Sequence, residues 1–350
     1  MNIVKVNASK AYEVKIGSGL LSRLGEEVAA CTNASKAVIV SDSNVWPLYG
    51  KIVAKSLENA GFTVYSHVFP GGESSKCADT YLALLNDLAG YHVTRTDCLI
   101  ALGGGVVGDL TGFAAATYLR GIPYIQVPTT LLAAVDSSVG GKTAIDLACG
   151  KNLVGAFYQP KLVLCDTNTL QTLPEDIFRD GCAEVVKYGI LYDPELFAHL
   201  QQYGLSFDRE TVIKRCVELK RDVVLEDEFD TGNRMKLNLG HTFGHGIEAA
   251  SNFAVSHGKA VAIGMGIISR CGAKFGICQE DVPKTVEQVL TQFGLPSRTA
   301  YPPEVLLDAA LSDKKRTGGT VSLIVPARIG HCIIRPTPVA ELKDFLKAGM

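Results

Sequence analysis

The segment CLIALGGGVVGDLTG, residues 98–112, decides the fold, because it joins a buried strand to a helix through a glycine-rich turn. Its first five residues are apolar enough for a strand buried on both faces, and the part after the glycines is typical of a helix. The pattern GxGxxG lies between the two, in the context that dinucleotide-binding folds require. Glycines allow close backbone approach to a pyrophosphate, and a helix N-terminus presents unpaired N–H groups. The segment therefore predicts an α/β fold that binds a nucleotide.

The motif is incomplete in one respect. The acidic residue expected about twenty positions after GxGxxG is missing, and the acid that closes a strand is instead Asp42, upstream in Asp42-Ser43-Asn44. A second glycine-rich loop, residues 136–143, has Asp136 where the Walker pattern needs glycine, so it is not a P-loop. Its Lys142 still suits contact with a phosphate or a polarised hydroxyl. The sequence thus predicts a nucleotide-binding site, but it does not specify that the strands follow the standard Rossmann order.

Apolar runs and helical stretches alternate over roughly the first 170 residues, which predicts a Rossmann-like α/β domain with a largely parallel sheet. The expected strands are residues 36–42, 62–65, 98–102, 124–128 and 162–166. After Pro174 the pattern becomes amphipathic and helical, and 321–325 is the one later strand expected. We predict an NAD-binding α/β domain at 1–174, an all-α metal- and substrate-binding domain at 175–350, and an active site in the cleft between them.

Composition narrows the class of protein. The 350 residues carry 34 Lys and Arg against 36 Asp and Glu, and 47% are hydrophobic. This balance predicts a globular protein and argues against a disordered chain or a basic nucleic-acid surface. The ten scattered cysteines form no CxxC pair, the N-terminus lacks a signal-peptide layout, and no apolar run is long enough for a bilayer. We expect a cytoplasmic protein that binds neither nucleic acid nor membrane.

Three of the seven histidines, His241, His245 and His257, fall within seventeen residues. His241 and His245 are four apart and would share a helix face. A single histidine is more often a satisfied polar group or a surface residue than a ligand. Three histidines flanked by glycines at 240, 244, 246 and 258 instead indicate close backbone packing and a metal site with two imidazole ligands and a catalytic neighbour. A catalytic zinc would need a third protein ligand and a position for water or substrate.

The chain resembles the 3-dehydroquinate synthase family of sugar phosphate cyclases over most of its length. The resemblance rests on residues 70–76 (PGGESSK), 103–112, 120–122, 126–130, 136–146, 150–157, 183–189 (AEVVKYG) and 237–245 (LNLGHTFGH). It implies that zinc, or cobalt in its place, is bound by Glu184, His241 and His257, which supplies the missing third ligand.

The resemblance also implies two sets of contacts. Those with NAD fall on Asp42, Asn44, Gly71, Gly72, Glu73, Ser74, Ser75, Lys76, Gly104, Gly105, Val106, Val107, Gly108, Asp109, Thr129, Thr130, Lys142, Lys151, Thr169, Leu170, Gln171 and Thr172. Those with substrate fall on Arg120, Asp136, Lys142, Asn152, Lys187, Lys220, Arg234, Asn238, His245 and one of Lys314 and Lys315. An isolated Lys or Arg is usually a surface charge. Several cations gathered in a near-neutral protein favour an anionic substrate.

The implied substrate is 3-deoxy-D-arabino-heptulosonate 7-phosphate, converted to 3-dehydroquinate in the shikimate pathway. The implied steps are transient oxidation by NAD, loss of phosphate, return of the hydride, ring opening and an intramolecular aldol closure. Arg234 and Asn238 would suit the carboxylate, and Lys142, Asn152 and Arg120 the phosphate. His245 would relay a proton. The family also implies a homodimer, in which Arg120 could reach a neighbouring site.

Three positions depart from the family pattern, namely Asp230 in place of Glu, Gly246 in place of Ala, and Ile177 in place of an acid. Three other functions remain open. A related cyclase could act on glucose 6-phosphate or sedoheptulose 7-phosphate, although neither offers a carboxylate to Arg234 and Asn238. A metal-dependent polyol dehydrogenase would consume NAD. A non-catalytic NAD-binding protein would have a structural zinc, which usually has four protein ligands.

Overall fold

Seven strands form the sheet of the first half of the chain, in the order β1-β2-β9-β6-β5-β3-β4. The computed structural model describes residues 1–307 and 319–350. Strands β1 and β2 pair antiparallel, and the remaining neighbours are parallel. The strands are β1 (Asn2–Asn7), β2 (Ala11–Gly17), β3 (Lys36–Asp42), β4 (Thr63–Phe69), β5 (Cys98–Gly103), β6 (Tyr124–Pro128) and β9 (Leu162–Asp166). The predicted parallel sheet is thus confirmed.

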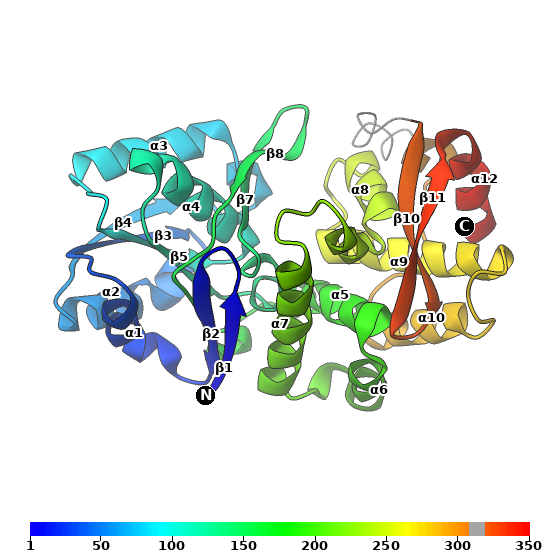
Figure 1. Ribbon diagram of the computed structural model, residues 1–350, viewed down its shortest axis with the longest axis horizontal. Helices are drawn as coiled ribbons and strands as arrows, with labels where there is room; N and C mark the ends of the chain where they lie inside the picture. The colour runs from blue at the N-terminus through cyan, green and yellow to red at the C-terminus, as the bar shows by residue number, and fades with distance from the viewer. Residues whose placement is uncertain (308–318) are drawn as a thin grey trace. The chain divides into compact units, whose positions relative to one another are not determined.

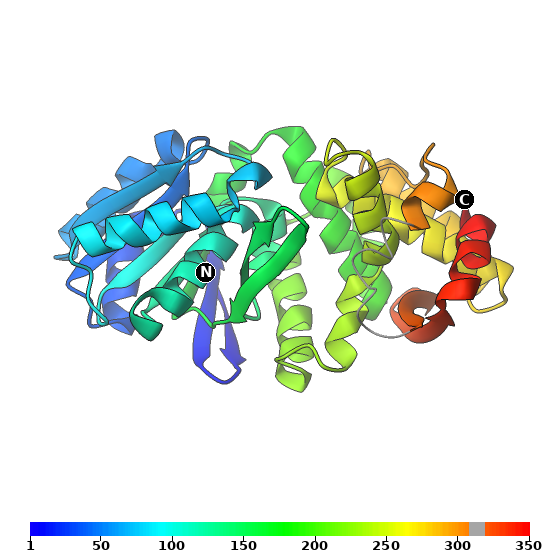
Figure 2. The same ribbon diagram turned by 90° about the horizontal axis from the view of Figure 1, so that it is seen from above.

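Helices cover both faces of this sheet, which is why its strands are apolar on both sides. On β3, Ile39 faces the cluster formed with α1 (Leu24–Cys31) and α2 (Trp46–Asn59). The adjacent Val40 faces the opposite cluster, formed with α3 (Ala78–Gly90) and α4 (Gly105–Thr117). Figure 1 shows the two helix pairs on opposite sides of the strands, and Figure 2 looks onto the face covered by α3 and α4.

Shorter elements complete this half of the chain. The antiparallel strands β7 (Lys142–Leu147) and β8 (Gly150–Phe157) form a hairpin that packs on α4. The short helical turns are η1 (Leu20–Arg23), η2 (Glu73–Ser75), η3 (Tyr118–Arg120), η4 (Ala133–Ser137) and η5 (Thr167–Gln171). Of these, η4 is a single π-helical turn. Such turns are rare in proteins overall, but those that occur are often found at functional sites.

The second half of the chain is mostly helical. Its elements are α5 (Glu175–Tyr192), α6 (Pro194–Tyr203), η6 (Gly204–Ser206), η7 (Asn233–Asn238), α8 (His241–Ala250), α9 (His257–Lys274), α10 (Val282–Gln292), β10 (Thr320–Arg328), β11 (His331–Pro338) and α12 (Val339–Gly349). Helix α9 is buried along most of its length and contacts α5, α8, α10 and α12. Among the residues that the structure describes, no helix combines the length and hydrophobicity that crossing a bilayer requires.

The structure corrects two details of the predicted division at Pro174. The chain forms two compact units, one of residues 1–174 and 209–229 and the other of residues 175–208 and 230–350. Helix α7 (Arg209–Glu226) therefore belongs with the first unit, where it contacts β1, β2 and η4. The second unit is not purely helical, because the expected strand at 321–325 extends to β10 and pairs with β11. Local periodicity does not reveal with which distant segment a helix or strand packs.

Candidate active site

The nucleotide-binding residues predicted in the first unit gather where its strand order reverses. Strands β4, β3, β5, β6 and β9 follow the order 2-1-3-4-5 of flavodoxin-like sheets, whose ligands bind beyond the carboxyl ends of the strands flanking the reversal. Those two strands are β3, which ends at Asp42, and β5, which leads into Gly104 and Gly105. The acid found upstream of the glycine motif, Asp42, thus lies beside the glycine turn, because its strand is the spatial neighbour of β5.

A second turn packs against Asp42. The carboxylate of Asp42 accepts hydrogen bonds from the backbone N–H groups of Asn44 (2.8 Å) and Val45 (3.0 Å). The Gly71 N–H donates to the Ser43 hydroxyl at 3.0 Å. A Cβ at Gly71 would lie 2.1 Å from the side-chain amide nitrogen of Asn44, so a larger residue there would displace the Asn44 side chain. The predicted contacts at Asp42, Asn44 and Gly71 are therefore brought together.

Lys76 links the predicted nucleotide and substrate sets. Its ammonium lies 2.6 Å from the Asp109 carboxylate and donates to the Asn152 side-chain oxygen at 2.5 Å. Burial lowers the pKa of Lys76, but the carboxylates of Asp109 and Glu73 outweigh burial and raise its pKa overall. Asn152 has φ 56°, and its N–H donates to Asp146 at 2.8 Å. The hydrogen bond from Lys76 to Asn152 thus links the β7–β8 hairpin to the turn that contains Gly71 and Lys76.

The remaining predicted nucleotide contacts surround the same strand ends. Gly104 is packed so that a Cβ would lie 3.1 Å from Thr130. The buried hydroxyl of Thr129, just after β6, has no hydrogen-bond partner among the described residues. A buried hydroxyl normally has a partner, so a polar ligand at this edge fits the residues present. The Tyr49 hydroxyl of α2 donates a hydrogen bond to the carbonyl oxygen of Thr169 on η5 and shares another with the hydroxyl of Thr172, which caps η5. The Lys151 ammonium lies 3.7 Å from the Glu73 carboxylate.

Two predicted substrate residues of the first unit meet at the π-helical turn. The Lys220 ammonium, on α7, donates to both the backbone carbonyl and the carboxylate of Asp136. Lys142 is exposed at the start of β7. Arg120 is exposed on η3 with φ 68°, and in the described part of the chain it makes no hydrogen bond or ion pair. The structure therefore joins Lys220 to Asp136 and leaves Arg120 apart from the other predicted residues.

Glu184, His241 and His257 meet in the second unit. The Glu184 Oε1 atom lies 3.5 Å from His241 Nε2 and 3.3 Å from His257 Nε2. One donor atom from each residue lies within 4.8 Å of the other two. Glu184 is fully buried on α5, while His241 and His257 are the first residues of α8 and α9. The three donors come from three helices and form the one such group found among the described residues.

The donor set fits a divalent cation. Burial lowers the pKa of His241, which keeps its imidazole neutral as a ligand must be. Burial also opposes protonation of His257, but the carboxylates of Glu184 and Glu248 outweigh it and raise the pKa of His257. The carboxylates of Glu184 and Glu248 thus favour a positive charge at this site. One carboxylate and two imidazoles are a ligand set that zinc accepts, with a fourth position left for water or substrate.

Glycines bring the three helices close enough for this geometry. A Cβ at Gly258 would lie 2.0 Å from the Asp180 carbonyl oxygen, and one at Gly264 would lie 1.9 Å from the Gly240 carbonyl oxygen. Gly240 itself has φ 79°, a region that favours glycine. The expected close backbone approach around the histidines is confirmed. Gly246, where the family often has Ala, packs against the backbone of Leu306, whose oxygen would lie 2.6 Å from a Cβ.

Asp180 fixes the start of α9. Its carboxylate accepts hydrogen bonds from the Ser256 hydroxyl and from the Lys259 N–H at 3.0 Å. Ser256 is the N-cap residue of α9, so Asp180 satisfies the first turn of the helix that begins with His257. Asp180 and Glu184 lie four residues apart on α5. One face of α5 thus both positions His257 and supplies the carboxylate beside it.

The other predicted residues of the second unit surround this group. The rings of His245 and His241 have centroids 5.6 Å apart, and His245 is not among the three possible ligands. Lys187 contacts Glu184 from the next turn of α5. Arg234 is buried on η7, and Asn238 follows four residues later. Lys314 and Lys315 lie outside the described residues.

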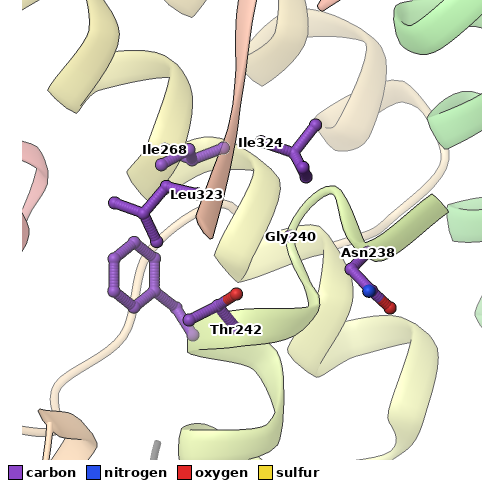
Figure 3. Close-up of a pocket in the computed structure, with 7 residues that line it drawn as sticks. Asn238, Gly240, Thr242, Ile268, Leu323 and Ile324 are labelled. Carbon is purple, nitrogen blue, oxygen red and sulfur yellow. The ribbon is translucent and has the colours of Figure 1, made fainter. Parts of the chain in front are cut away.

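Asn238 also borders a small pocket. Its empty volume is about 180 Å³, and its lining includes Gly240, Thr242, Ile268 and Leu323. Figure 3 shows Asn238 at the end of η7, just before the turn at Gly240 and apart from the apolar side chains of Ile268 and Leu323. The pocket is smaller than the roughly 300–1,000 Å³ of typical ligand pockets. It does not include the Glu184 group.

The departures from the family pattern have partial explanations. Asp230 has φ 57°, and Asp is favoured over longer side chains in the left-handed region. Ile177 is 44% exposed on the first turn of α5, and nothing in the structure explains its identity.

Sequence reasoning missed Asp180 and Glu248. Glu248 follows His241 by seven residues, a spacing that places both on one helix face, and it interrupts an apolar stretch of α8.

Family models and a relative of known family match the chain over most of its length. The family model described as 3-dehydroquinate synthase N-terminal matches residues 66–180, and that described as 3-dehydroquinate synthase C-terminal matches residues 181–316. A 3-dehydroquinate synthase of Rhizobium leguminosarum bv. trifolii (strain WSM2304) is 43% identical over 354 residues, which cover 97% of this chain and 94% of that protein.

Two solved structures are also similar. The first is 2-deoxy-scyllo-inosose synthase complexed with carbaglucose-6-phosphate, NAD+ and Co2+, with a TM-score of 0.90, 25% identity and 100% coverage of both chains. The second is 2-epi-5-epi-valiolone synthase from Streptomyces hygroscopicus subsp. jinggangensis 5008 with NAD+ and Zn2+ bound, with a TM-score of 0.87, 28% identity and 96% coverage of both chains.

Proposed function

The chain belongs to the 3-dehydroquinate synthase family, and from that premise we propose how its own residues carry out the reaction. The reaction converts 3-deoxy-D-arabino-heptulosonate 7-phosphate to 3-dehydroquinate and phosphate, in the shikimate pathway, with NAD and a divalent metal ion. The observation that carries the proposal is the meeting of Glu184, His241 and His257 around one point. When bound, the metal polarises substrate hydroxyls and NAD takes up and returns a hydride.

The metal site is assigned to Glu184, His241 and His257. Three protein donors leave room for the substrate to bind the same ion, as catalytic sites require and structural sites usually do not. Zinc is the proposed native metal because imidazole and carboxylate are its ordinary ligands. Cobalt would suit the same donors.

NAD is assigned to the strand ends of the first unit. The glycine turn before α4 lets the backbone approach the pyrophosphate at the helix N-terminus. Asp42 and Asn44 line the adjacent strand end, beside Gly71 to Lys76. The unpartnered Thr129 hydroxyl supplies a further polar contact. Thr130, Lys151 and the Thr169 to Thr172 turn complete the assigned set.

The substrate anions are assigned to the cations that the family resemblance implies. Arg234 and Asn238 bind the carboxylate, since a guanidinium and an amide four residues apart offer several donors to two oxygens. Lys142, Asn152 and Arg120 bind the phosphate. Lys220, held by Asp136, and Lys187, held by Glu184, orient the substrate hydroxyls. One of Lys314 and Lys315, which lie outside the described residues, is assigned to the same set from the family resemblance.

His245 is assigned the proton relay. It lies beside His241 in the same helix and is outside the group of possible ligands. A ring nitrogen of its imidazole can accept a proton from the hydroxyl being oxidised and return it later. Holding one flexible intermediate in place for every step would supply much of the remaining rate enhancement.

We also propose that the enzyme is a cytoplasmic homodimer. Its ten cysteines carry no disulfide, which is consistent with a reducing compartment. Exposed Arg120, on the strained η3 turn, would then be available to a neighbouring subunit. Sedimentation of the wild-type chain and of Arg120→Ala would test this arrangement separately from the chemistry.

A phosphate-release assay tests the function. We expect release from 3-deoxy-D-arabino-heptulosonate 7-phosphate, with NAD at catalytic amounts and no steady growth of NADH absorbance. Glucose 6-phosphate and sedoheptulose 7-phosphate serve as controls, since they lack the carboxylate. Chelator should stop phosphate release, and added zinc or cobalt should restore it. Accumulating NADH, or faster release from either control sugar, would overturn the proposal.

A further inference from the structure

The two histidines of the metal site have different partners on their far sides. The Nδ1 atom of His241 lies 3.1 Å from the Leu239 carbonyl oxygen, a neutral acceptor on its own chain segment. The Nδ1 atom of His257 instead lies 3.6 Å from the Oε2 atom of Glu248, a carboxylate on another helix. Both rings thus turn Nε2 toward the Glu184 carboxylate. On the Nδ1 side, His241 has a neutral carbonyl as its neighbour and His257 has a carboxylate.

Glu248 is built into this position. It is 3% exposed and projects from α8, which packs on α9, the helix that begins with His257. A buried carboxylate is costly unless a cation or hydrogen-bond donor compensates it. Its own carbonyl oxygen accepts from Phe253 N at 2.8 Å and from the Ser251 hydroxyl at 2.9 Å, which fixes the backbone where α8 ends. The side chain of Glu248 lies beside the ring of His257, the residue that begins the next helix.

We propose that Glu248 is the positioning residue of the metal site, holding His257 in the tautomer that carries its proton on Nδ1 and its lone pair on Nε2. The inference rests on the proposed metal site and adds a residue to it. Carboxylates behind metal-bound histidines fix ring orientation and raise the basicity of the ligand, and their loss typically weakens metal affinity about 10–100-fold. Leu239 orients His241 without a charge, so His257 is the stronger donor of the two.

Metal affinity is the first test. Glu248→Ala removes the acceptor, and Glu248→Gln keeps its size and one oxygen acceptor but not its charge. Competition with a chelator of known affinity should show zinc binding weakened about 10–100-fold in Glu248→Ala, with Glu248→Gln between it and wild type. Glu280→Gln, an exposed carboxylate of the same unit, is the matched control and should bind like wild type. Thermal unfolding of the metal-free proteins checks that each variant is folded.

Cobalt-loaded protein provides a readout that a general loss of stability would not produce. Proton NMR of the Co2+ form should show one shifted, exchangeable Nδ1–H signal from each ligating histidine. Glu248→Gln should move the His257 signal and speed its exchange, while the His241 signal stays in place because Leu239 is untouched. His257→Ala and His241→Ala identify the two signals.

The outcomes are distinguishable. If wild type holds one Co2+ per chain while the affinity and both signals are unchanged in the Glu248 variants, the role of Glu248 is refuted and the metal site stands. If wild type itself fails to hold one ion per chain, the metal site falls and this inference falls with it. A changed His257 signal with weakened binding in Glu248→Gln supports the proposal.

Discussion

Lys187 and Glu184 form an ion pair along α5, with the Lys187 ammonium against Oε2 while Oε1 faces the two histidines. The lysine is 1% and the glutamate 0% exposed. The two oxygens of the carboxylate therefore contact different groups. Lys187 restrains Oε2, so Glu184 would present a single oxygen, Oε1, to a metal ion.

Lys187→Met should destabilise the metal-free enzyme more than the metal-loaded enzyme. Removing one partner of a buried ion pair costs about 3–5 kcal/mol, because the remaining charge loses its partner. A bound cation would compensate Glu184 in its place. Urea unfolding with and without zinc measures both values, with the exposed Lys274→Met as the control. Equal losses in the two states would contradict the separate roles of the two oxygens.

His245→Ala should keep its metal and lose turnover. His245 lies beside His241 but outside the ligand group, so its loss should leave the donors intact. Loss of a general acid–base group typically costs about 10²–10⁴-fold in rate. Metal content by elemental analysis and phosphate release by a coupled assay are the two measurements. Stoichiometric loss of metal would make His245 a ligand instead.

Arg234→Ala should weaken use of the substrate far more than binding of NAD. The guanidinium is buried on η7 in the second unit, whereas the nucleotide residues lie in the first. Only the substrate offers a carboxylate for it to bind. Titration of NAD by fluorescence and the kcat/KM for the heptulosonate phosphate separate the two effects. Comparable losses in both would argue against the carboxylate assignment.

Gly258→Ala should disrupt the metal site through the backbone. The added Cβ would lie 2.0 Å from the Asp180 carbonyl oxygen, so α5 and α9 would have to separate. Overpacking of this kind costs about 1–3 kcal/mol and would shift His257 away from Glu184. The control is Gly90→Ala, where a Cβ meets nothing within 4 Å. Chelator competition and thermal unfolding should both respond in Gly258→Ala and neither in Gly90→Ala.

Asp97 should contribute stability above about pH 4 that disappears in acid. Burial raises its pKa, but hydrogen bonds from Thr94, Lys36 N and Ser35 outweigh burial and lower the pKa overall. A lowered pKa in the folded state means that stability is present above the unfolded value, about 3.9, and is lost as pH falls through the folded value.

Asp97→Asn tests this sign. The variant should be less stable than wild type at pH 7 by about 1.5–3 kcal/mol, the contribution of hydrogen bonds to a charged group. The difference should shrink as pH falls below 4. Urea unfolding at several pH values measures it. A difference that stayed constant with pH would show that the carboxylate charge is not responsible.

Much of the site could be predicted because its signals are local. The strands ending at Asp42 and Gly103 are nearly those expected from apolar runs. The glycines around His241 and His257 indicated close packing, which the structure confirms. The third ligand, Glu184, followed only from the family resemblance, since a single glutamate in an amphipathic helix carries no signal of its own.

The sequence by itself determined the α/β pattern, the glycine turn and the histidine cluster that supplies two of the three proposed ligands, because these follow from preferences within a few neighbouring residues. Tertiary structure alone decided that α7 packs with the first unit, that β11 pairs with β10, and that Asp42 stands beside the glycine turn. It also decided that Glu248 stands behind His257 while Leu239 stands behind His241. Such pairings join segments far apart in the chain, and they depend on which surfaces pack rather than on the residues between them.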